Sequence, residues 1–292
     1  MDAERNRLDG KAGVGLRLPH LEEVVSRAPA AAWLEAHPEN FLANPHAREL
    51  LLDVAAHYPV SLHTMGLSIG SADGVDREHL ARLRRLCDDV DPVLVSGHLA
   101  WSTHRGLYLN DLLPLPYDEE TLGIVAVHLD QVQQALGRPY LVENPASYVR
   151  FAASTMSEVQ FLAELVDRTG CRLLCDVSNA YVSAANLGYD AYAYIDAFPA
   201  DAVAELHLGG FTPEPDGGGP GEELLIDTHA GRIAAPVWAL YAHALRRFGA
   251  RPTLIEWDNR LSTFAALHAE AEHADGVAAG VLGEIVPHAA AR

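Results

Sequence analysis

Cysteine is rare in this sequence of 292 residues, which contains three: Cys87, Cys171 and Cys175. An odd number of cysteines without a C-x-x-C pair predicts no disulfide framework, and each is interpreted as a small core residue. Lysine and arginine are also scarce, with 21 of them against 40 aspartates and glutamates, so the formal net charge is −19. This charge argues against a nucleic-acid backbone or an anionic membrane as partner.

Long apolar runs are missing as well. No stretch of the sequence has the length of a membrane span, and the first ten residues, MDAERNRLDG, lack the apolar segment of a signal peptide. We therefore expect a soluble protein of the cytoplasm, which is a reducing compartment. Hydrophobic residues make up 49% of the chain, which is enough for a large core and excludes extensive disorder.

Short strand-like runs alternate with segments of helical spacing along the whole chain. The runs predict strands at 13–18, 32–37, 60–65, 92–100, 140–144, 172–177, 203–210 and 253–257. Eight strands separated by helices predict an α/β fold, a (β/α)8 TIM barrel, as a single domain over residues 1–292. The barrel itself is expected at about 13–275, between a polar N-terminal extension and an Ala-rich C-terminal tail. An open doubly wound sheet is disfavoured because no G-x-G-x-x-G follows the first strand.

Caps and breakers mark the intervening segments. Helices are expected over 45–58, 76–90, 119–137, 155–170 and 234–249, and Thr155 with Glu158 has the spacing of a capping box. The stretch TPEPDGGGPGEE at 212–223 predicts a mobile loop after the seventh strand. Such a loop can fold over the end of a barrel while adding little to the core, so we expect it to act as a lid.

Polar residues with ligand chemistry follow nearly every predicted strand. The carboxyl ends of barrel strands converge on one mouth, where the active sites of this fold lie. The residues placed there are Glu35, Glu39, Asn40, His63, His98, Glu143, Asn144, Asp176, Asn179, His207, Glu256 and Asp258, with Asp227 and His229 in the loop after strand seven. The sequence therefore predicts one shared polar site.

So many carboxylates and imidazoles in a small volume point to bound metal. Without cations, repulsion between like charges would keep several of the acids protonated. Imidazole and carboxylate donors without thiolate suit iron, manganese or zinc, and the number of donors exceeds one coordination sphere. A single histidine in a strand is usually a core residue, so only the coincidence at many strand ends indicates a multinuclear site. Histidines in helical segments are expected to be solvated or half-buried: His46, His57, His79, His128, His243 and His268.

Seven longer motifs carry a resemblance to a known family. They are LHTMGLSIGS (62–71), SGHLAWS (96–102), LVENPASY (141–148), CDVSNAYVSAANLG (175–188), ELHLGGF (205–211), LIDTHAGRIAAPVW (225–238) and TLIEWDNRL (253–261). Together they resemble the DUF692 family of multinuclear non-haem iron-dependent oxidases, which includes the methanobactin biosynthesis enzyme MbnB. The resemblance extends over nearly the whole chain.

The resemblance implies a TIM barrel that binds two or three iron ions and modifies a ribosomally made peptide with O2, often at cysteine. It implies the iron ligands His63, His98, Glu143, Asp176, Asn179, His207, Asp227, His229 and Glu256. Of these, His63, His98, Glu143, Asp176, His207 and Glu256 are also expected to take part in catalysis. The implied partners are a ribosomal precursor peptide and a small protein that binds its leader.

Two other functions stay open at this point. A metal-dependent isomerase or hydrolase of the sugar-isomerase or AP-endonuclease type would also be a barrel with His, Glu and Asp at its mouth. It would use a redox-silent divalent metal and consume no O2. A non-catalytic, metal-dependent subunit that presents a peptide to another enzyme is the second alternative.

Overall fold

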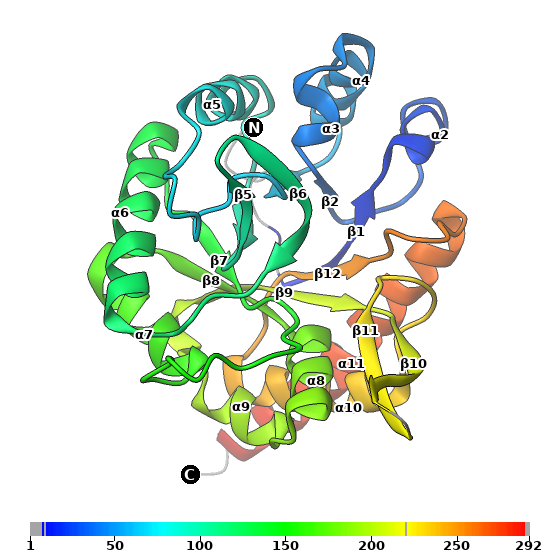
Figure 1. The fold of residues 1–292 in the computed structure, drawn as a ribbon. Helices are drawn as coiled ribbons and strands as arrows, with labels where there is room; N and C mark the ends of the chain where they lie inside the picture. The colour runs from blue at the N-terminus through cyan, green and yellow to red at the C-terminus, as the bar shows by residue number, and fades with distance from the viewer. Residues whose placement is uncertain (1–7, 9, 220, 290–292) are drawn as a thin grey trace. The chain divides into compact units, whose positions relative to one another are not determined.

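The computed structural model describes residue 8 and residues 10–219 and 221–289. Within this part of the chain, eight strands form a closed barrel (Figure 1). Their order is β1 (Ala12–Leu16), β12 (Thr253–Glu256), β9 (Val203–Gly209), β8 (Arg172–Asp176), β7 (Leu141–Glu143), β4 (Val95–His98), β3 (Val60–Thr64) and β2 (Leu34–Ala36). The predicted TIM barrel is therefore confirmed, and the eight predicted runs are the eight barrel strands.

The barrel strands are buried along most of their length, as parallel strands covered on both sides must be. Every residue of β1, β3, β7 and β12 is buried. Parallel register runs through β2–β3–β4–β7–β8 and through β9–β12–β1. Because the strands are parallel, their carboxyl ends lie at the same edge within each run.

The described residues cluster by their contacts into two compact units. The first unit comprises residue 8, Leu16–Pro145 and Arg150–Leu174. The second comprises residues 10–15, Ala146–Val149, 175–219 and 221–289. The expectation of one domain over 1–292 stays a prediction, and the N-terminal extension lies largely outside the described residues.

The first unit holds β2, β3, β4 and β7 together with the helices that follow them. Its helical segments are η1 (Leu18–His20), α2 (Leu21–Arg27), α3 (Glu39–Leu42), α4 (Pro45–Ala55), α5 (Arg77–Val90), α6 (Glu119–Leu136) and α7 (Glu158–Thr169). The predicted capping box is shifted by two residues: Ser157 is the N-cap, and Ser157 with Gln160 forms the box. Thr155 lies outside the helix because its backbone N–H donates to the carbonyl of Tyr117 instead.

A β-hairpin that the sequence did not predict follows β4. It consists of β5 (Trp101–His104) and β6 (Leu107–Leu113), and its turn contains Gly106 at φ +74°. The hairpin carries exposed apolar side chains at its tip, including Leu107 at 67% exposure. Strand periodicity was hard to see here because the hairpin faces solvent on both sides over Leu107–Asp111.

The second unit holds β9, β12 and most of β1. Its helical segments are α8 (Val177–Leu187), α9 (Ala191–Ala197), η2 (Ala200–Ala202), α10 (Ala235–Phe248) and α11 (Phe264–Ala289). Helix α11 continues through the residues expected to form an Ala-rich tail, as far as Ala289. Helices α5, α6, α7 and α8 each end at a residue in the left-handed conformation. For α6 and α7 this is the glycine at the end of the predicted helix, Gly137 and Gly170, and for α8 it is Gly188.

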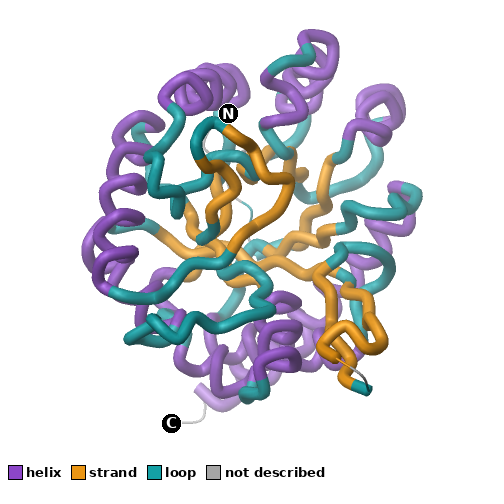
Figure 2. Tube along the Cα trace, in the orientation of Figure 1, coloured by secondary structure: helices purple, strands orange, loops and turns teal. Residues whose placement is uncertain are grey.

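The segment 212–223 was expected to be a mobile loop, and for its described residues, 212–219 and 221–223, the loop assignment is wrong. Its mobility stays a prediction. Strands β10 (Phe211–Gly219) and β11 (Glu222–Asp227) pair there as an antiparallel hairpin, drawn in orange in Figure 2. The pairing is regular from Phe211 to Glu214 and is interrupted before Gly219. The Gly/Pro content is accommodated because most of this hairpin is solvent-exposed, where ladder gaps are tolerated. Its role as a lid stays a prediction.

The prediction that the three cysteines are core residues is confirmed, whereas the prediction for one histidine is wrong. Cys87, Cys171 and Cys175 are buried and form no disulfide among the described residues. His128, however, was expected to be solvated or half-buried, whereas it is buried and its Nδ1 lies 2.8 Å from the carbonyl oxygen of Ile69. No helix in the described part of the chain is long and apolar enough to cross a membrane.

Candidate metal centre

The first group of ligand residues, called here the first cluster, lies within the first unit and consists of His63, His98 and Glu143. They are at or next to the carboxyl ends of β3, β4 and β7. The Nε2 atoms of His63 and His98 lie 3.2 and 3.3 Å from the same Glu143 oxygen, Oε2, and 3.2 Å from each other. Three donor atoms therefore converge on one point.

The register of the barrel produces this convergence. His98 on β4 stands opposite Glu143 on β7, and His63 on β3 stands opposite Ser96 on β4. The Oγ of Ser96 lies 2.8 Å from Nδ1 of His63. When Nδ1 donates its proton to Ser96, Nε2 is left with a lone pair directed at the other two donors.

The first cluster fits a transition-metal ion. Its atoms are imidazole nitrogens and a carboxylate oxygen, which suit iron, manganese or zinc. Neighbouring ligand atoms of an ion with bonds of about 2.1 Å are separated by about 3 Å, which matches the spacing in this cluster. Lone pairs held this close repel one another unless a proton or a cation lies between them.

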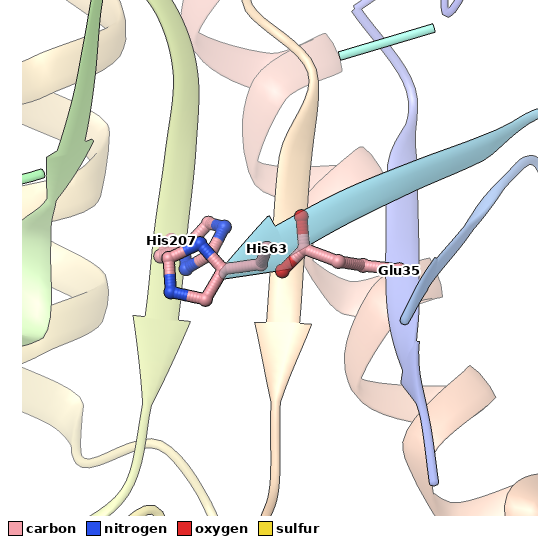
Figure 3. A group of neighbouring side chains, drawn as sticks. All are labelled: Glu35, His63 and His207. Atoms are coloured by element: carbon pink, nitrogen blue, oxygen red, sulfur yellow. The ribbon is translucent and has the colours of Figure 1, made fainter. Parts of the chain in front are cut away.

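Glu35 lies at the same end of the first unit but was left outside the implied ligand set. It is fully buried on β2 and its Oε2 accepts a 2.7 Å hydrogen bond from Ser61. Figure 3 draws the side chains of Glu35 and His63, together with His207 of the second unit. A buried carboxylate beside a histidine-rich cluster is a further oxygen donor for an ion. The sequence signal for it was its place inside the second strand.

The second group, called the second cluster, lies within the second unit and consists of Asp176, His207, Asp227, His229 and Glu256. Asp176, His229 and Glu256 bring one ligand atom each within the reach of a single ion. Nδ1 of His207 lies 3.1 Å from Oε2 of Glu256, and Nδ1 of His229 lies 3.5 Å from the same oxygen. Oδ1 of Asp227 lies 2.9 Å from Nε2 of His229.

The charged groups of the second cluster change one another's pKa values. Burial, reinforced by the neighbouring Asp227, raises the pKa of Asp176 to about 7. Burial lowers the pKa of His229, but the carboxylates of Asp227 and Glu256 outweigh it and bring that pKa well above its usual value. Without metal the cluster thus holds protons that a cation would replace, as metal sites commonly do.

His229 reaches the cluster through a constrained turn. Its φ is +45°, in the left-handed region that a side chain rarely adopts, and its carbonyl accepts from the backbone N–H of Asp258 at 2.9 Å. A Cβ on Gly209 would lie 2.6 Å from Cδ2 of His229, so only glycine leaves room for this ring. Ser178 fixes Gly209 from the other side by hydrogen bonds of 2.8 and 3.0 Å to its backbone.

Asp176 joins a strand end to a helix start. It is the last residue of β8 and the N-cap of α8, and its Oδ1 accepts a 2.7 Å hydrogen bond from the backbone N–H of Asn179. Asn179 is buried in the first turn of α8. Its role as an iron ligand stays a prediction.

Glu205 belongs to the second unit's buried polar residues and was missed by sequence reasoning. It is fully buried on β9, and its Oε1 lies 3.6 Å from Nε2 of His207. The signal was available, because residues two apart in a strand point to the same face and Glu205 precedes His207 by two. Asp258, which was expected at the barrel mouth, has its Oδ2 3.7 Å from Nδ1 of His229.

Curated relatives cover nearly the whole chain. It is 50% identical over 264 residues to a UPF0276 protein of Vibrio vulnificus, with 90% of each chain covered. It is 45% identical over 273 residues to a UPF0276 protein of Chromobacterium violaceum, covering 94% of this chain and 96% of that one. A UPF0276 protein of Caulobacter vibrioides is 46% identical over 269 residues, with 92% and 95% covered.

Solved structures share the fold at low identity. An L-ribulose 3-epimerase matches with a TM-score of 0.62 and 18% identity, covering 96% of this chain and 99% of that one. Endonuclease IV from Thermus thermophilus matches with a TM-score of 0.52 and 16% identity, covering 94% and 99%. At these identities the likeness extends to the barrel alone.

A match to the sequence model of a protein family shows to which family the chain belongs. The model described as RiPP precursor modification enzyme MbnB/TglH/ChrH matches residues 11–279, which include every member of both clusters. The matched segment also contains all eight barrel strands. The chain therefore belongs to the MbnB/TglH/ChrH family of RiPP precursor modification enzymes.

Proposed function

We propose that this protein is a multinuclear non-haem iron-dependent oxidase that uses O2 to modify a ribosomally synthesised peptide at a cysteine. The observation that supports this most is the presence of two nitrogen- and oxygen-rich ligand groups, one in each unit, in a chain of a peptide-modifying family. Each group offers at least three ligand atoms to one ion. The proposal therefore includes at least one iron ion per cluster, and two or three in all.

Some residues of the two clusters would hold the ions, and others would position the side chains that do so. His63, His98 and Glu143 would hold one ion, and Asp176, His229 and Glu256, supported by His207 and Asp227, would hold another. Iron, when bound, would supply the electrons that reduce O2. Ser96 would keep the Nδ1 proton of His63 in place, so that Nε2 stays a ligand. Glu205 would place a further carboxylate beside His207, with its Oε1 3.6 Å from Nε2 of that ring.

The substrate sulfur would come from the peptide and not from this chain. Cys87, Cys171 and Cys175 are buried, and burial raises the pKa of Cys87 and of Cys171 to about 11. Their thiols therefore stay protonated at neutral pH and are poor ligands. The site residues leave the role of thiolate to a cysteine of the precursor peptide.

A second protein would help to hold that peptide. Ordering a flexible chain costs conformational free energy, which an additional binding surface can offset. We propose a separate small partner, encoded nearby, that binds the leader of the precursor peptide.

Reconstitution tests the proposal. The purified protein is loaded anaerobically with ferrous iron and mixed with O2, a peptide encoded nearby and the candidate partner, and the product is analysed by mass spectrometry. We expect a mass change that requires iron and O2 and is lost in His98→Ala. Equal rates without the partner would remove the partner from the proposal. Turnover of a ketose or an abasic site without O2 use would favour the isomerase or endonuclease reaction instead.

A further inference from the structure

A cavity of about 530 Å³ lies within the first unit, away from the ligand atoms of the first cluster. Its lining residues come from the start of α3, from the segment between β3 and α5 with the first turn of α5, and from the β5–β6 hairpin. These elements are labelled in Figure 1. Its walls include Glu39, Asp73, His79, Leu107 and Tyr108. No member of the first cluster lines it, so the proposed iron chemistry does not account for it.

Glu39 supplies a fixed negative charge to this cavity. Its Oε1 accepts hydrogen bonds from the backbone N–H groups of Met65 at 3.1 Å and Gly66 at 2.8 Å, and lies 3.3 Å from Nε2 of His79. Burial raises the pKa of Glu39, but the nearby His79 imidazole and the hydrogen bonds from the backbone amides outweigh it and leave the pKa below its usual value. The other oxygen, Oε2, is shielded from solvent and has no hydrogen-bond partner among the described residues.

A second acid and an apolar rim complete the cavity. Asp73 accepts a hydrogen bond from the backbone N–H of Arg105, and its side chain stays 39% exposed. Leu107 and Tyr108 at the hairpin tip are 67% and 56% exposed, so they form an apolar rim that a ligand can cover. Burial and the Glu39 carboxylate both raise the pKa of Tyr108, which indicates that this ring lies near Glu39.

The charge of the walls selects the ligand. Among the described residues that line the cavity there is no Lys or Arg, while three are acidic: Glu39, Asp73 and Asp76. Asp76 is already engaged as the N-cap of α5 by the N–H groups of Glu78 and His79. Glu39 has the imidazole of His79 beside it at 3.3 Å and Asp73 has that of His104 at 3.8 Å. With no Lys or Arg among the described lining residues, the walls disfavour an anionic ligand and favour a cationic one.

We infer that this cavity binds a lysine or arginine side chain of the precursor peptide, with a neighbouring apolar residue against Leu107 and Tyr108. The identity of the ligand as a peptide rests on the proposed function. The cation would pair with Glu39 in a partly buried setting, where a charge-assisted hydrogen bond is strong. The exposed apolar tip of the hairpin would be covered by the same peptide segment.

The test uses two probe peptides that differ only in charge. Acetyl-Leu-Arg-amide and acetyl-Leu-citrulline-amide are titrated into the full-length protein, and the backbone amide signals of Gly66 and Gly106 are followed by NMR. We expect the arginine peptide to bind about tenfold more tightly, because one charge-assisted hydrogen bond separates the two. In Glu39→Gln this preference should disappear, and in the matched control Glu49→Gln, on the exposed face of α4, it should persist.

If Glu39→Gln does not fold, a second variant, Leu107→Ser, still tests the inference. Leu107→Ser, at an exposed position, should weaken both probes by about fivefold while leaving their ratio unchanged. Equal affinity of the two probes for the wild-type protein would overturn the inference. So would a tenfold preference that survives in Glu39→Gln.

Failure of the proposed function gives a different result. If no peptide is modified with iron and O2 but the charge preference is observed, the cavity is a cation-binding site in a protein of another activity. If a peptide is modified in the wild type and the two probes bind equally, the oxidase stands and the inferred cavity ligand is wrong.

Discussion

The two clusters reach similar chemistry by different structural means. In the first, the candidate ligands are His63, His98 and Glu143, at or next to the ends of adjacent strands in parallel register. In the second, Asp227 comes from the end of a hairpin and His229 from a turn with φ of +45°. The first cluster is therefore built by the regular barrel, and the second depends on irregular segments fixed by glycine and hydrogen bonds.

The difference predicts different vulnerabilities. Strand-end ligands are held by a ladder of backbone hydrogen bonds, so only a change of the ligands or of their direct partners should remove them. A ligand on a strained turn depends on the residues packed around it. We therefore expect a single added carbon atom beside such a ligand to displace it. Electrostatics differ too, because the second cluster contains three carboxylates and the first contains one.

Truncation of a shared carboxylate should have the largest effect. Glu143→Ala removes the oxygen that both imidazoles of the first cluster face, and Asp176→Ala removes a buried ligand of the second. Each variant should lose about one ion per chain, since an ion needs three or more protein ligands, and the double variant should lose more. Metal analysis of anaerobically purified protein, with Mössbauer spectroscopy, measures this.

The control for both variants is His57→Ala. His57 is exposed, beyond the end of α4, and its Nδ1 lies 2.8 Å from the carbonyl of Asp53. Its replacement should leave the iron content and the circular dichroism spectrum unchanged. Full retention of iron in both Glu143→Ala and Asp176→Ala would refute the metal centre.

Gly209→Ala should affect the second cluster and not the first. The added Cβ would meet the His229 ring at 2.6 Å, so the ring must move away from Glu256 and Asp227. We expect a loss of iron from the second cluster and a destabilisation of about 1–3 kcal/mol, typical of overpacking. Gly123→Ala is the matched control, because a Cβ there on α6 has nothing within 4 Å. A Gly209→Ala protein with unaltered iron would show that the turn is adaptable.

Ser96→Ala should have a smaller effect, confined to the first cluster. The hydroxyl lies 2.8 Å from Nδ1 of His63 and fixes the ring and its tautomer. Loss of such an outer hydrogen bond lowers metal affinity by about 10–100-fold. Competition with a chelator of known affinity measures this, and Ser26→Ala, on exposed α2, is the control. An unchanged affinity would show that the Ser96 hydroxyl does not support His63 as a ligand.

The smallest effect is on the stability of the first unit, independent of metal. Asp76 caps α5 by accepting from the N–H groups of Glu78 and His79, and the hydrogen bond from His79, against some burial, lowers the pKa of Asp76. Asp76→Ala should reduce the unfolding free energy by about 1 kcal/mol at pH 7. Because the pKa is lowered on folding, the stabilisation is present above the usual value of 3.8 and is lost as the pH falls further.

Urea denaturation at pH 7 and pH 3 measures this difference. The gap between wild type and Asp76→Ala should narrow at pH 3, while the iron content at pH 7 stays equal. Glu49→Ala, an exposed acid in α4, should show neither change. A gap of the same size at both pH values would mean that the cap acts without its charge.

The barrel strands could be predicted because each is a buried apolar run between helical segments. Leu173, Leu174 and Cys175 are wholly buried before the chain reaches Asp176, so the acid at the end of β8 marks the strand boundary. The hairpins could not be predicted in this way. Strands β6 and β10 are exposed along most of their length and carry no buried face, so they lack the periodicity from which strands are recognised.

The candidate ligands also differ in how far the sequence predicts them. His63, His98, Glu143, His207 and Glu256 follow from strand ends, and the sequence alone determined that these residue types stand at the carboxyl edge of a parallel sheet. Only the tertiary structure decided which of their donor atoms lie close enough to share an ion, because register sets the 3.2 Å approach of His63 to Glu143. It also decided the place of His229, since a left-handed turn and the bare Cα of Gly209 are needed to bring that ring to Glu256. Such contacts depend on packing between segments far apart in the chain, which local periodicity does not encode.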